Sequence, residues 1–237
     1  MGIMNYAQLI QDGMDEGSPL GEYASKIMVE TDRIGTIVKN LLSFARQDKQ
    51  ESRSAARMSD IVNDTLSLVA TVMRHDQITF TVDVPEDLPM IKCSSQQIHQ
   101  VVMNLLTNAR DALNEKYAEF DENKRIMITA HVLDKDGQHW IRTSVEDAGP
   151  GIFKEVRELM FAPFYTTKPK GKGTGLGLSI SHGIVKDHHG EMSVESELGE
   201  WTRFHVDLPV GNGEGAGTSC ERARPPNQAL EPTHCGT

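Results

Sequence analysis

The chain has 237 residues, of which 38% are apolar and 24% are charged, a composition typical of a soluble globular protein with one or two domains. Its formal net charge of −10 argues against a general nucleic-acid binder or a protein that binds anionic membranes. The three cysteines form no C-x-x-C pair, no apolar run approaches a membrane span, and no signal peptide precedes the first helix. We therefore expect a cytoplasmic chain with no nucleic-acid partner and no membrane contact of its own.

Residues 1–46 have the pattern of a helical hairpin. Apolar residues recur at helical spacing over 1–12, and the turn-forming segment DGMDEGSP follows them. Ser18 can cap a second helix with Pro19 at its first position. In that helix apolar residues repeat at heptad spacing, at Ile27, Ile34 and Leu41, with Ile37, Val38 and Phe44 on the other seam. This stripe is too wide for one short partner, so we expect a homodimer through 1–46, with two hairpins packed as a four-helix bundle.

The rest of the chain divides into a linker, an α+β domain and a tail. Residues 47–57 lack apolar periodicity and are expected to be a linker, and 211–237 are rich in glycine and proline and expected to be disordered. Within 58–210 the pattern predicts helices over 59–73, 95–117 and 175–188, and strands over 78–84, 125–133, 139–146, 191–196 and 202–208. This order favours a two-layer α/β sandwich, in which a mixed sheet carries its helices on one face.

Two asparagines lie four residues apart on the predicted long helix. In NLLTNARDA, Asn104 and Asn108 share one helical face, while Leu105, Leu106 and Ala109 point toward the core. The two amide oxygens could hold a hydrated Mg²⁺, which keeps several waters and usually bridges phosphate and protein oxygens. The alternative is that both asparagines only lie on a solvated face.

The segment DAGPG (147–151) follows a predicted strand and permits a sharp turn. Asp147 would then be held at the strand end with its carboxylate facing a cleft. A carboxylate only accepts hydrogen bonds, which matches an exocyclic amino group such as that of adenine. Turn chemistry alone is the alternative explanation of this segment.

Alternating glycines and lysines mark the segment FAPFYTTKPKGKGTGLGL (161–178), which we call the lid. Its glycines at 171, 173, 175 and 177 allow backbone N–H groups to approach an anion, and a helix is predicted to begin after Thr174 with its positive dipole end toward that anion. Lysines at 168, 170 and 172 add cations. The spacing fits neither the P-loop nor the Rossmann fingerprint. The alternative is a flexible surface loop with solvated lysines.

These elements in this order, the asparagine helix, DAGPG, FAPF and GTGLGL, resemble the ATP-binding catalytic domain of sensor histidine kinases of two-component systems. That domain belongs to the superfamily shared with DNA gyrase and MutL. The resemblance covers about 59–209, and the hairpin over 1–46 resembles the dimerisation and phosphotransfer bundle that precedes this domain in the same family. It therefore implies ATP and Mg²⁺ as cofactors and the receiver domain of a response regulator as partner.

The resemblance also implies a role for each motif. Asn104 and Asn108 belong to the asparagine box that holds Mg²⁺, and Asp147 accepts the adenine amino group. The expected catalytic residues are Asn104, Lys168 and Lys172, the two lysines being candidate phosphate contacts. The expected nucleotide-binding residues are Asn108, Asp147, Gly149, Gly151, Phe161, Phe164, Gly173, Thr174, Gly175, Leu176, Gly177 and Thr202; the two phenylalanines anchor the lid.

Two features depart from the family's pattern. The phosphoacceptor histidine of the family lies on the first helix, in an H-E or H-D dipeptide with a proline five residues after the histidine, and 1–12 contains no histidine. His75 and Asp76 mimic the dipeptide, but Phe80 occupies the proline position, so the chain is expected to begin downstream of the acceptor and not to label itself. Trp201 replaces a glycine that usually precedes the position of Thr202, and its ring could alter the pocket floor or cover a strand.

The sequence thus predicts a kinase that transfers the ATP γ-phosphate to a histidine upstream of this chain, for relay to a response-regulator aspartate. Hydrolytic relatives place a glutamate near the position of Asn104 to activate water, and an amide cannot accept that proton, which costs on the order of 10²–10⁴ in rate. Two alternatives remain, a weak ATPase of the gyrase and MutL type, and an acceptor-less module that only binds ATP and dimerises.

Overall fold

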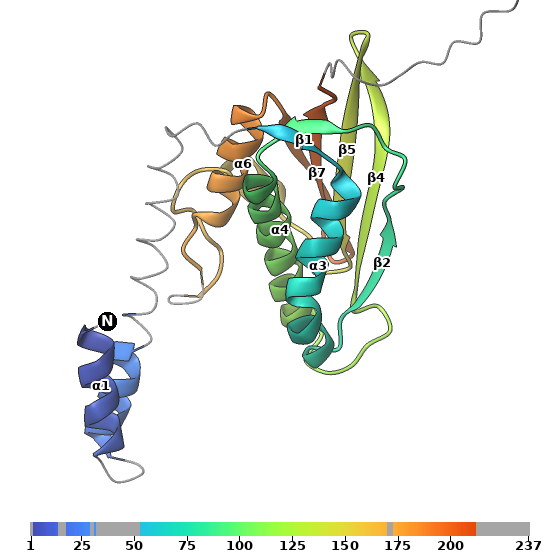
Figure 1. Ribbon diagram of the computed structural model, residues 1–237. Coiled ribbons are helices and arrows are strands. Elements are labelled where there is room, and N and C mark those ends of the chain that lie inside the picture. Colours follow the sequence, from blue (N-terminus) through green and yellow to red (C-terminus); the bar gives the residue numbers. More distant parts are fainter. Residues whose placement is uncertain (1, 14–17, 29–30, 32–52, 170–172, 212–237) are drawn as a thin grey trace, which may run out of the picture.

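The computed structural model describes residues 2–13, 18–28, 31, 53–169 and 173–211 (Figure 1). At the N-terminus, α1 (Gly2–Asp12) and a second helix over 19–28 lie against each other. The Gln11 side chain donates a hydrogen bond to Ser25 Oγ at 2.9 Å, and Ala7 and Ala24 are buried. The predicted heptad positions at 34, 37, 38, 41 and 44 lie outside the described residues, as do 47–52 of the predicted linker and 212–237 of the predicted tail.

The α/β domain is built on a mixed five-stranded sheet. Its strand order is β2-β4-β5-β7-β6, and the pair β2 and β4 is parallel while the other neighbours are antiparallel. The strands are β2 (Thr79–Asp83), β4 (Arg125–Lys135), β5 (Gln138–Asp147), β6 (Glu191–Glu197) and β7 (Trp201–Pro209). This arrangement confirms the predicted mixed sheet.

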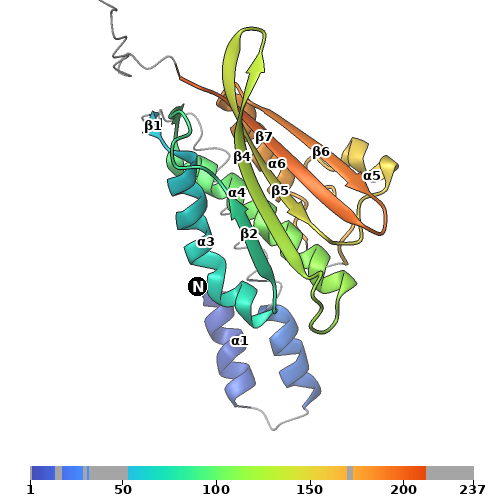
Figure 2. The same ribbon diagram turned by 90° about the vertical axis from the view of Figure 1, so that its right-hand side faces the viewer.

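Three helices cover one face of this sheet (Figures 1 and 2). They are α3 (Met58–His75), α4 (Ser95–Lys116) and α6 (Gly177–Asp187), and α4 packs against both of the others. A short helix, α5 (Lys154–Leu159), precedes the lid. The predicted two-layer α/β sandwich with helices on one face is therefore confirmed. None of the helices in the described part of the chain combines the length and apolar character needed to cross a bilayer.

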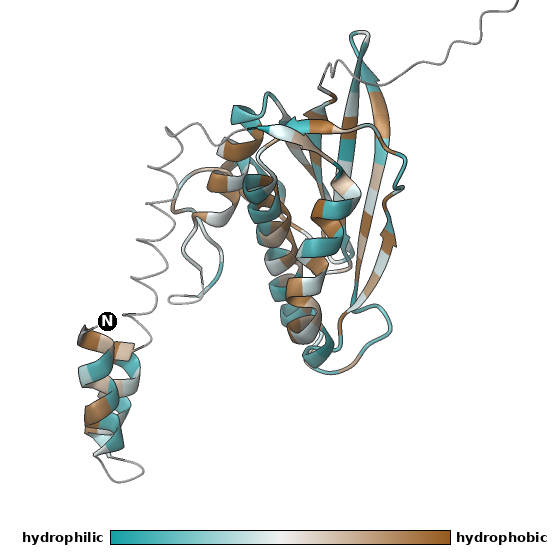
Figure 3. Ribbon diagram, viewed as in Figure 1, coloured by the Kyte–Doolittle hydropathy of each residue, from teal (hydrophilic) through white to brown (hydrophobic). Residues whose placement is uncertain are grey.

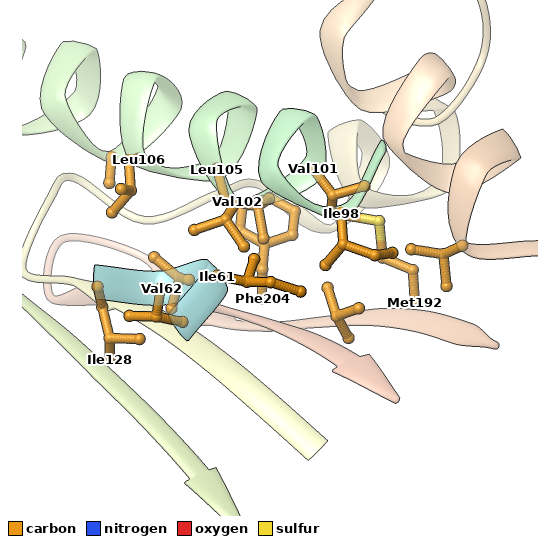
Figure 4. Close-up of a cluster of buried hydrophobic side chains, with 14 of the residues drawn as sticks. Ile61, Val62, Ile98, Val101, Val102, Leu105, Leu106, Ile128, Met192 and Phe204 are labelled. Atoms are coloured by element: carbon orange, nitrogen blue, oxygen red, sulfur yellow. The ribbon is translucent and has the colours of Figure 1, made fainter. Parts of the chain in front are cut away.

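The core lies between the helices and the sheet. Figure 4 shows α3 side chains (Ile61, Val62) and α4 side chains (Ile98, Val101, Val102, Leu105, Leu106) meeting those of the sheet (Ile128, Met192, Phe204). All of these are buried, and hydropathy coloured on the ribbon shows the same apolar stripes along the helices (Figure 3). Burying one such side chain stabilises the fold by roughly 1.5–3 kcal/mol, so this layer fixes where α4 lies on the sheet.

Three short elements were not predicted. β1 (Ser54–Ala56) falls inside the predicted linker and pairs antiparallel with β3 (Ile91–Cys93), and α5 is the third. Each has six residues or fewer, too short for a helical or strand period to be recognised. The pairing of β1 with β3 means that the folded domain begins before residue 58.

Candidate functional site

One face of α4 carries the asparagines. Ser94 caps the helix by accepting a hydrogen bond from Gln97 N at 3.4 Å. Because the buried α4 residues face the sheet and α3, the polar residues at 104, 108 and 111 lie on the opposite side of the helix, toward α6 and the lid. Asn104 and Asn108 therefore share one face of α4, as predicted. The contacts of each residue show which of its atoms are available to a ligand.

Asn104 connects α4 to the beginning of α6. Its amide nitrogen donates to the carbonyl oxygen of Gly177 at 3.1 Å and to Ser181 Oγ at 3.0 Å. A side chain at position 177 would begin 3.8 Å from this amide, so the two helices approach closely there. With the nitrogen used in these contacts, the amide oxygen is the atom that Asn104 can offer to a ligand.

Asn108 and Asp111 contact the lid. Lys168 Nζ lies 3.2 Å from Asn108 Oδ1 and 2.6 Å from Asp111 Oδ2. A cationic group therefore already lies against the oxygen atoms of this part of α4. Asp111 was not predicted, although its spacing of three residues from Asn108 places it on the same face.

Asp147 is the last residue of β5, and its side chain is buried, with the residue 4% exposed. Oδ1 accepts a hydrogen bond from Gly149 N at 2.9 Å. Burial raises the pKa of this carboxyl to about 7, against the opposing effects of the Gly149 hydrogen bond and of Lys116, while the neighbouring Glu146 raises it further. Among the described residues no other hydrogen bond reaches the carboxylate, so Oδ2 is the oxygen that can accept from a ligand.

The two glycines after Asp147 are required by close contacts. A Cβ on Gly149 would lie 2.4 Å from Asp147 Oδ1 and 3.0 Å from the Cβ of Ala112 on α4. Gly151 has a positive φ of 73°, and a Cβ there would lie 2.2 Å from the carbonyl oxygen of Glu197. Larger residues would displace the turn, so the local structure requires glycine at both positions.

The lid is held at both of its ends. Phe161 packs against the core and lies 5.2 Å from the His182 ring of α6, whereas Phe164 is 64% exposed and has a positive φ of 65°. The Phe164 N–H donates to the carbonyl oxygen of Gly175 at 2.9 Å. A Cβ on Gly173 would lie 2.5 Å from Thr166 Oγ1. The Phe161 ring therefore anchors the lid through packing, and Phe164 does so through its backbone.

The lid leads directly into α6. Thr174 Oγ1 accepts a hydrogen bond from Leu176 N at 3.3 Å, and the Leu176 side chain is buried. The first N–H groups of a helix have no partner within the helix, so the start of α6 at Gly177 offers donors beside Asn104. Lys172 lies outside the described residues.

Thr202 and Trp201 lie on opposite faces of β7. Thr202 is buried, pairs with Asp147 in the strand register and lies 3.1 Å from Ser196 Oγ. The Trp201 ring stacks instead on the guanidinium of Arg203, 4.9 Å from the ring centre, on the face away from the helices. Of the two possibilities considered for Trp201, the structure supports the covering of a strand.

The His75 and Asp76 dipeptide connects two helices. Asp76 follows the last residue of α3 and accepts hydrogen bonds from Arg110 and Asn114 of α4, which hold its pKa at about 2 against the effect of burial. The His75 side chain is exposed. These contacts give Asp76 a structural role in the packing of α3 on α4.

A magnesium ion would have to bind through amide and nucleotide oxygens. No group of three or more His, Cys, Asp or Glu side chains within the described ranges is arranged to hold a metal. The side-chain oxygens of Asn104 and Asn108 are hard donors, and Asn108 Oδ1 already contacts the Lys168 cation. This donor set fits Mg²⁺, which takes one or two protein oxygens and completes its shell with phosphate and water.

Lys116, the last residue of α4, was also missed by sequence reasoning. Its ammonium group donates to the carbonyl oxygens of Ala148 and Gly149 in the Asp147 turn and to that of Gly199 in the turn between β6 and β7. Its spacing of eight residues from Asn108 turns it about 80° away from the asparagine face, so that face gives no signal for Lys116. Its acceptors are backbone atoms, which no side-chain motif reveals.

The helix-covered mixed sheet, the asparagine helix, the buried aspartate and the glycine-rich helix start together define an ATP-binding domain without a P-loop. The chain belongs to the family of histidine kinase-, DNA gyrase B- and HSP90-like ATPases, whose model matches residues 93–212. The resemblance to the catalytic domain of sensor histidine kinases is thereby confirmed.

Three of the proteins that resemble this chain are named as kinases. Sporulation kinase E of Bacillus subtilis (strain 168) is 33% identical over 198 residues, which are 82% of this chain and 25% of that protein. Sensor kinase CckA of Brucella abortus (strain 2308) is 35% identical over 77% of this chain and 20% of that protein. The crystal structure of histidine kinase ThkA in complex with response regulator protein TrrA matches with a TM-score of 0.62 and 28% identity, over 88% of this chain and 57% of that one. The chain thus spans a quarter or less of the two curated relatives.

Proposed function

We propose that this chain is the ATP-binding catalytic part of a histidine kinase of a two-component system, which transfers the ATP γ-phosphate to a histidine outside the chain. The observation that carries the proposal is the meeting of Asn108, Asp111 and Lys168 beside the start of α6, one α4 turn from Asn104. The proposal is supported by the nearness of amide oxygens, a lysine cation and helical N–H donors, the groups that bind a polyphosphate. The similarity to sporulation kinase E and sensor kinase CckA supports the same function.

Each part of the site has a proposed task. Asp147 Oδ2 accepts a hydrogen bond from the amino group of adenine, Thr202 contacts the nucleotide beside Asp147, and the glycines at 149 and 151 shape the turn that surrounds the base. Asn108 and the oxygen of Asn104 hold the cation, and Lys168 and Lys172 contact the phosphates, with the lid glycines and the start of α6 around them. A bound Mg²⁺ would neutralise charge on the phosphate oxygens. The protein residues then have the task of aligning the γ-phosphate with its acceptor, which is most of what phosphoryl transfer requires.

The contacts of Asn104 favour a kinase over an ATPase. Its amide nitrogen donates to Gly177 O and Ser181 Oγ, so the side chain is held in place and offers no base that could accept a proton from water. A weak hydrolase remains the second candidate. Hydrolysis of ATP at the site would be slow because Asn104 supplies no general base to activate the water.

The proposed partners follow from the same assignment. The receiver domain of a response regulator is the proposed acceptor of the relayed phosphate, as ThkA binds the response regulator TrrA in its crystal structure. We propose homodimerisation through 1–46, because apolar side chains of α1 and of 19–28, including Tyr6, Leu9 and Leu20, are exposed. Deleting 1–46 should convert a dimer to a monomer in light scattering. A dimer that persists would place the interface on the α/β domain.

The nucleotide assignment is tested by binding. Titration calorimetry should show Mg-dependent binding of ATP in preference to GTP, and Asp147→Asn should weaken ATP more than GTP because one acceptor oxygen becomes a donor. Equal losses for the two nucleotides would contradict the adenine contact.

The kinase assignment is tested by transfer. Incubation with γ-labelled ATP and an added helical hairpin bearing an H-E-x-x-x-P segment should give acid-labile, alkali-stable phosphohistidine on the hairpin, while the chain itself stays unlabelled. Label on any of its own nine histidines would overturn the expectation that the acceptor lies outside, and His75 would be examined first. Phosphate release without transfer would favour the ATPase.

A further inference from the structure

Lys116 joins two turns that are far apart in the sequence. Its Nζ lies 2.9 Å from the carbonyl oxygen of Ala148, 3.0 Å from that of Gly149 and 2.9 Å from that of Gly199, with Glu200 O at 3.4 Å. An ammonium group has three protons, so the three shorter contacts use all of its donors. Each is a charge-assisted hydrogen bond to a backbone atom, and together they hold the turn after Asp147 against the turn between β6 and β7.

Neighbouring contacts make the junction tight. The Tyr117 hydroxyl donates to Ala148 O at 3.2 Å, so this carbonyl accepts two hydrogen bonds. Gly199 N donates to Pro150 O at 2.7 Å, and the missing side chain of Gly151 leaves room for Glu197 O. Lys116 also ends α4, where the negative end of the helix dipole favours a cation. The ammonium group is thus held in place by its surroundings.

Gly149 links Lys116 to the Asp147 carboxylate through two hydrogen bonds. Its carbonyl oxygen accepts from Lys116, while its N–H donates to Asp147 Oδ1 at 2.9 Å. The Cα of Gly149 packs so closely that a Cβ would lie 3.0 Å from that of Ala112 on α4. Since this N–H makes the one hydrogen bond to the carboxylate among the described residues, the orientation of the carboxylate depends on where Lys116 holds the turn.

We propose that Lys116 is a positioning residue that sets the base selectivity of the nucleotide site by fixing the Asp147 turn. The inference rests on the proposed function, in which the Asp147 carboxylate accepts the exocyclic amino group of adenine. Guanine presents a carbonyl oxygen at the corresponding ring position, which a carboxylate oxygen repels. Discrimination therefore requires a carboxylate that cannot turn away, and Lys116 supplies that constraint without touching the base.

The test compares four proteins with Mg-ATP and Mg-GTP as the ligands. Lys116→Met removes the ammonium at similar chain length, Lys116→Gln keeps one donor group, and Lys92→Met is the matched control on the exposed side of β3. Titration calorimetry gives both affinities, and thermal unfolding without nucleotide gives the stability of each variant.

Lys116→Met removes all three hydrogen bonds that hold the Asp147 turn. We expect it to lower ATP affinity roughly tenfold, while GTP affinity changes less than about twofold. The ratio of ATP to GTP affinity should thus fall about fivefold or more in Lys116→Met and by a smaller factor in Lys116→Gln. Lys92→Met should match the wild type. If Lys116→Met does not fold, the ratio in Lys116→Gln decides.

An unchanged ratio would overturn the role of Lys116, whether or not the melting temperature falls, because a purely structural lysine would weaken both nucleotides equally. This result differs from a failure of the proposed function. If the wild type binds neither nucleotide, the nucleotide site itself is wrong, and the selectivity role falls with it.

Discussion

Lys168 of the lid lies 2.6 Å from Oδ2 of Asp111 on α4, and its ammonium group also contacts Asn108 Oδ1. The Lys168 and Asp111 side chains are each about one-third exposed, at 31% and 34%. An ion pair this accessible contributes about 0–1 kcal/mol in water. The ion pair with Asp111 therefore holds the lid lysine beside Asn108, a proposed cation ligand, and a nucleotide with its metal can replace this interaction.

Asp111→Asn should raise ATP affinity about two- to fivefold, because it frees Lys168 for the phosphates and removes a negative charge near them. The measurement is calorimetric titration with Mg-ATP at low and at physiological salt, with a smaller effect expected at the higher ionic strength. Glu115→Gln, an exposed change of equal charge on the same helix, is the control. A fall in affinity for Asp111→Asn would instead place Asp111 among the ligands of the metal.

Asn108→Ala should abolish the part of ATP affinity that depends on Mg²⁺ while leaving the fold intact. Asn108 contacts Lys168 rather than the core, so its loss leaves no buried polar group unpaired. Titrations with ATP in the presence of Mg²⁺ and of chelator separate the two components, and circular dichroism checks the fold. Unchanged Mg-dependent affinity would remove Asn108 from the cation site.

The pH dependence of folding should carry the signature of Asp147. Its carboxyl has a pKa of about 7 in the fold and an ordinary value near 4 when unfolded, because burial disfavours the charge. The folded state then holds its proton more tightly, so stability from this group is present below pH 4 and lost as the pH rises through about 7. Relative to Asp147→Asn, the wild type should lose on the order of 2–4 kcal/mol between pH 4 and pH 8.

Denaturant unfolding at a series of pH values measures the difference in unfolding free energy between the wild type and Asp147→Asn. The contributions of the other titratable groups cancel in this comparison. Nucleotide binding should respond in the opposite direction, because ionised Asp147 is the better acceptor and ATP affinity rises with pH relative to Asp147→Asn. A difference between the two proteins that does not vary with pH would show that Asp147 stays ionised in the fold.

Gly175→Ala should damage the lid without damaging the core. Gly175 has a positive φ of 66°, and a Cβ there would lie 2.4 Å from the carbonyl carbon of Phe164, whose N–H bonds to Gly175 O. ATP affinity should fall several-fold while the melting temperature changes little, since this contact lies at the surface. Gly183→Ala is the control, because a Cβ at that position of α6 meets no atom within 4 Å and should stabilise the helix by about 0.5–1 kcal/mol. Equal affinities for the two variants would contradict the role of the contact between Phe164 and Gly175.

The long elements could be predicted from the sequence because each has enough residues to display its period. The bounds expected for the second long helix, 95–117, differ from α4 by one residue, and the alternating pattern over 78–84 corresponds to β2. β1 and β3 could not be found this way. They are three residues each and form only because the chain brings Ser54 and Cys93 together, a long-range pairing that no local pattern encodes.

The side chains of the site were easier to predict than the contacts between them. Asn104, Asn108 and Asp147 could be chosen because their chemistry suits a ligand and glycines mark the surrounding turns. Asp111 and Lys116 were missed because their partners, the Lys168 ammonium and three backbone carbonyls, become neighbours only after the sheet has formed. The sequence pattern identifies groups that can bind, while tertiary structure decides which of them hold others in place.

The helix α4 sets the spacing between the parts of the site. Asn104 at α6, Asn108 at the lid and Lys116 at the Asp147 turn follow one another along a single rigid rod, and twelve residues of α-helix span about 18 Å. Base recognition and phosphate recognition are therefore kept at a fixed separation by helical geometry alone. One residue inserted between 108 and 116 would rotate Lys116 by about 100° away from its turn, while Asn104 and Asn108 would stay in place. Base recognition would then no longer be coupled to phosphate binding.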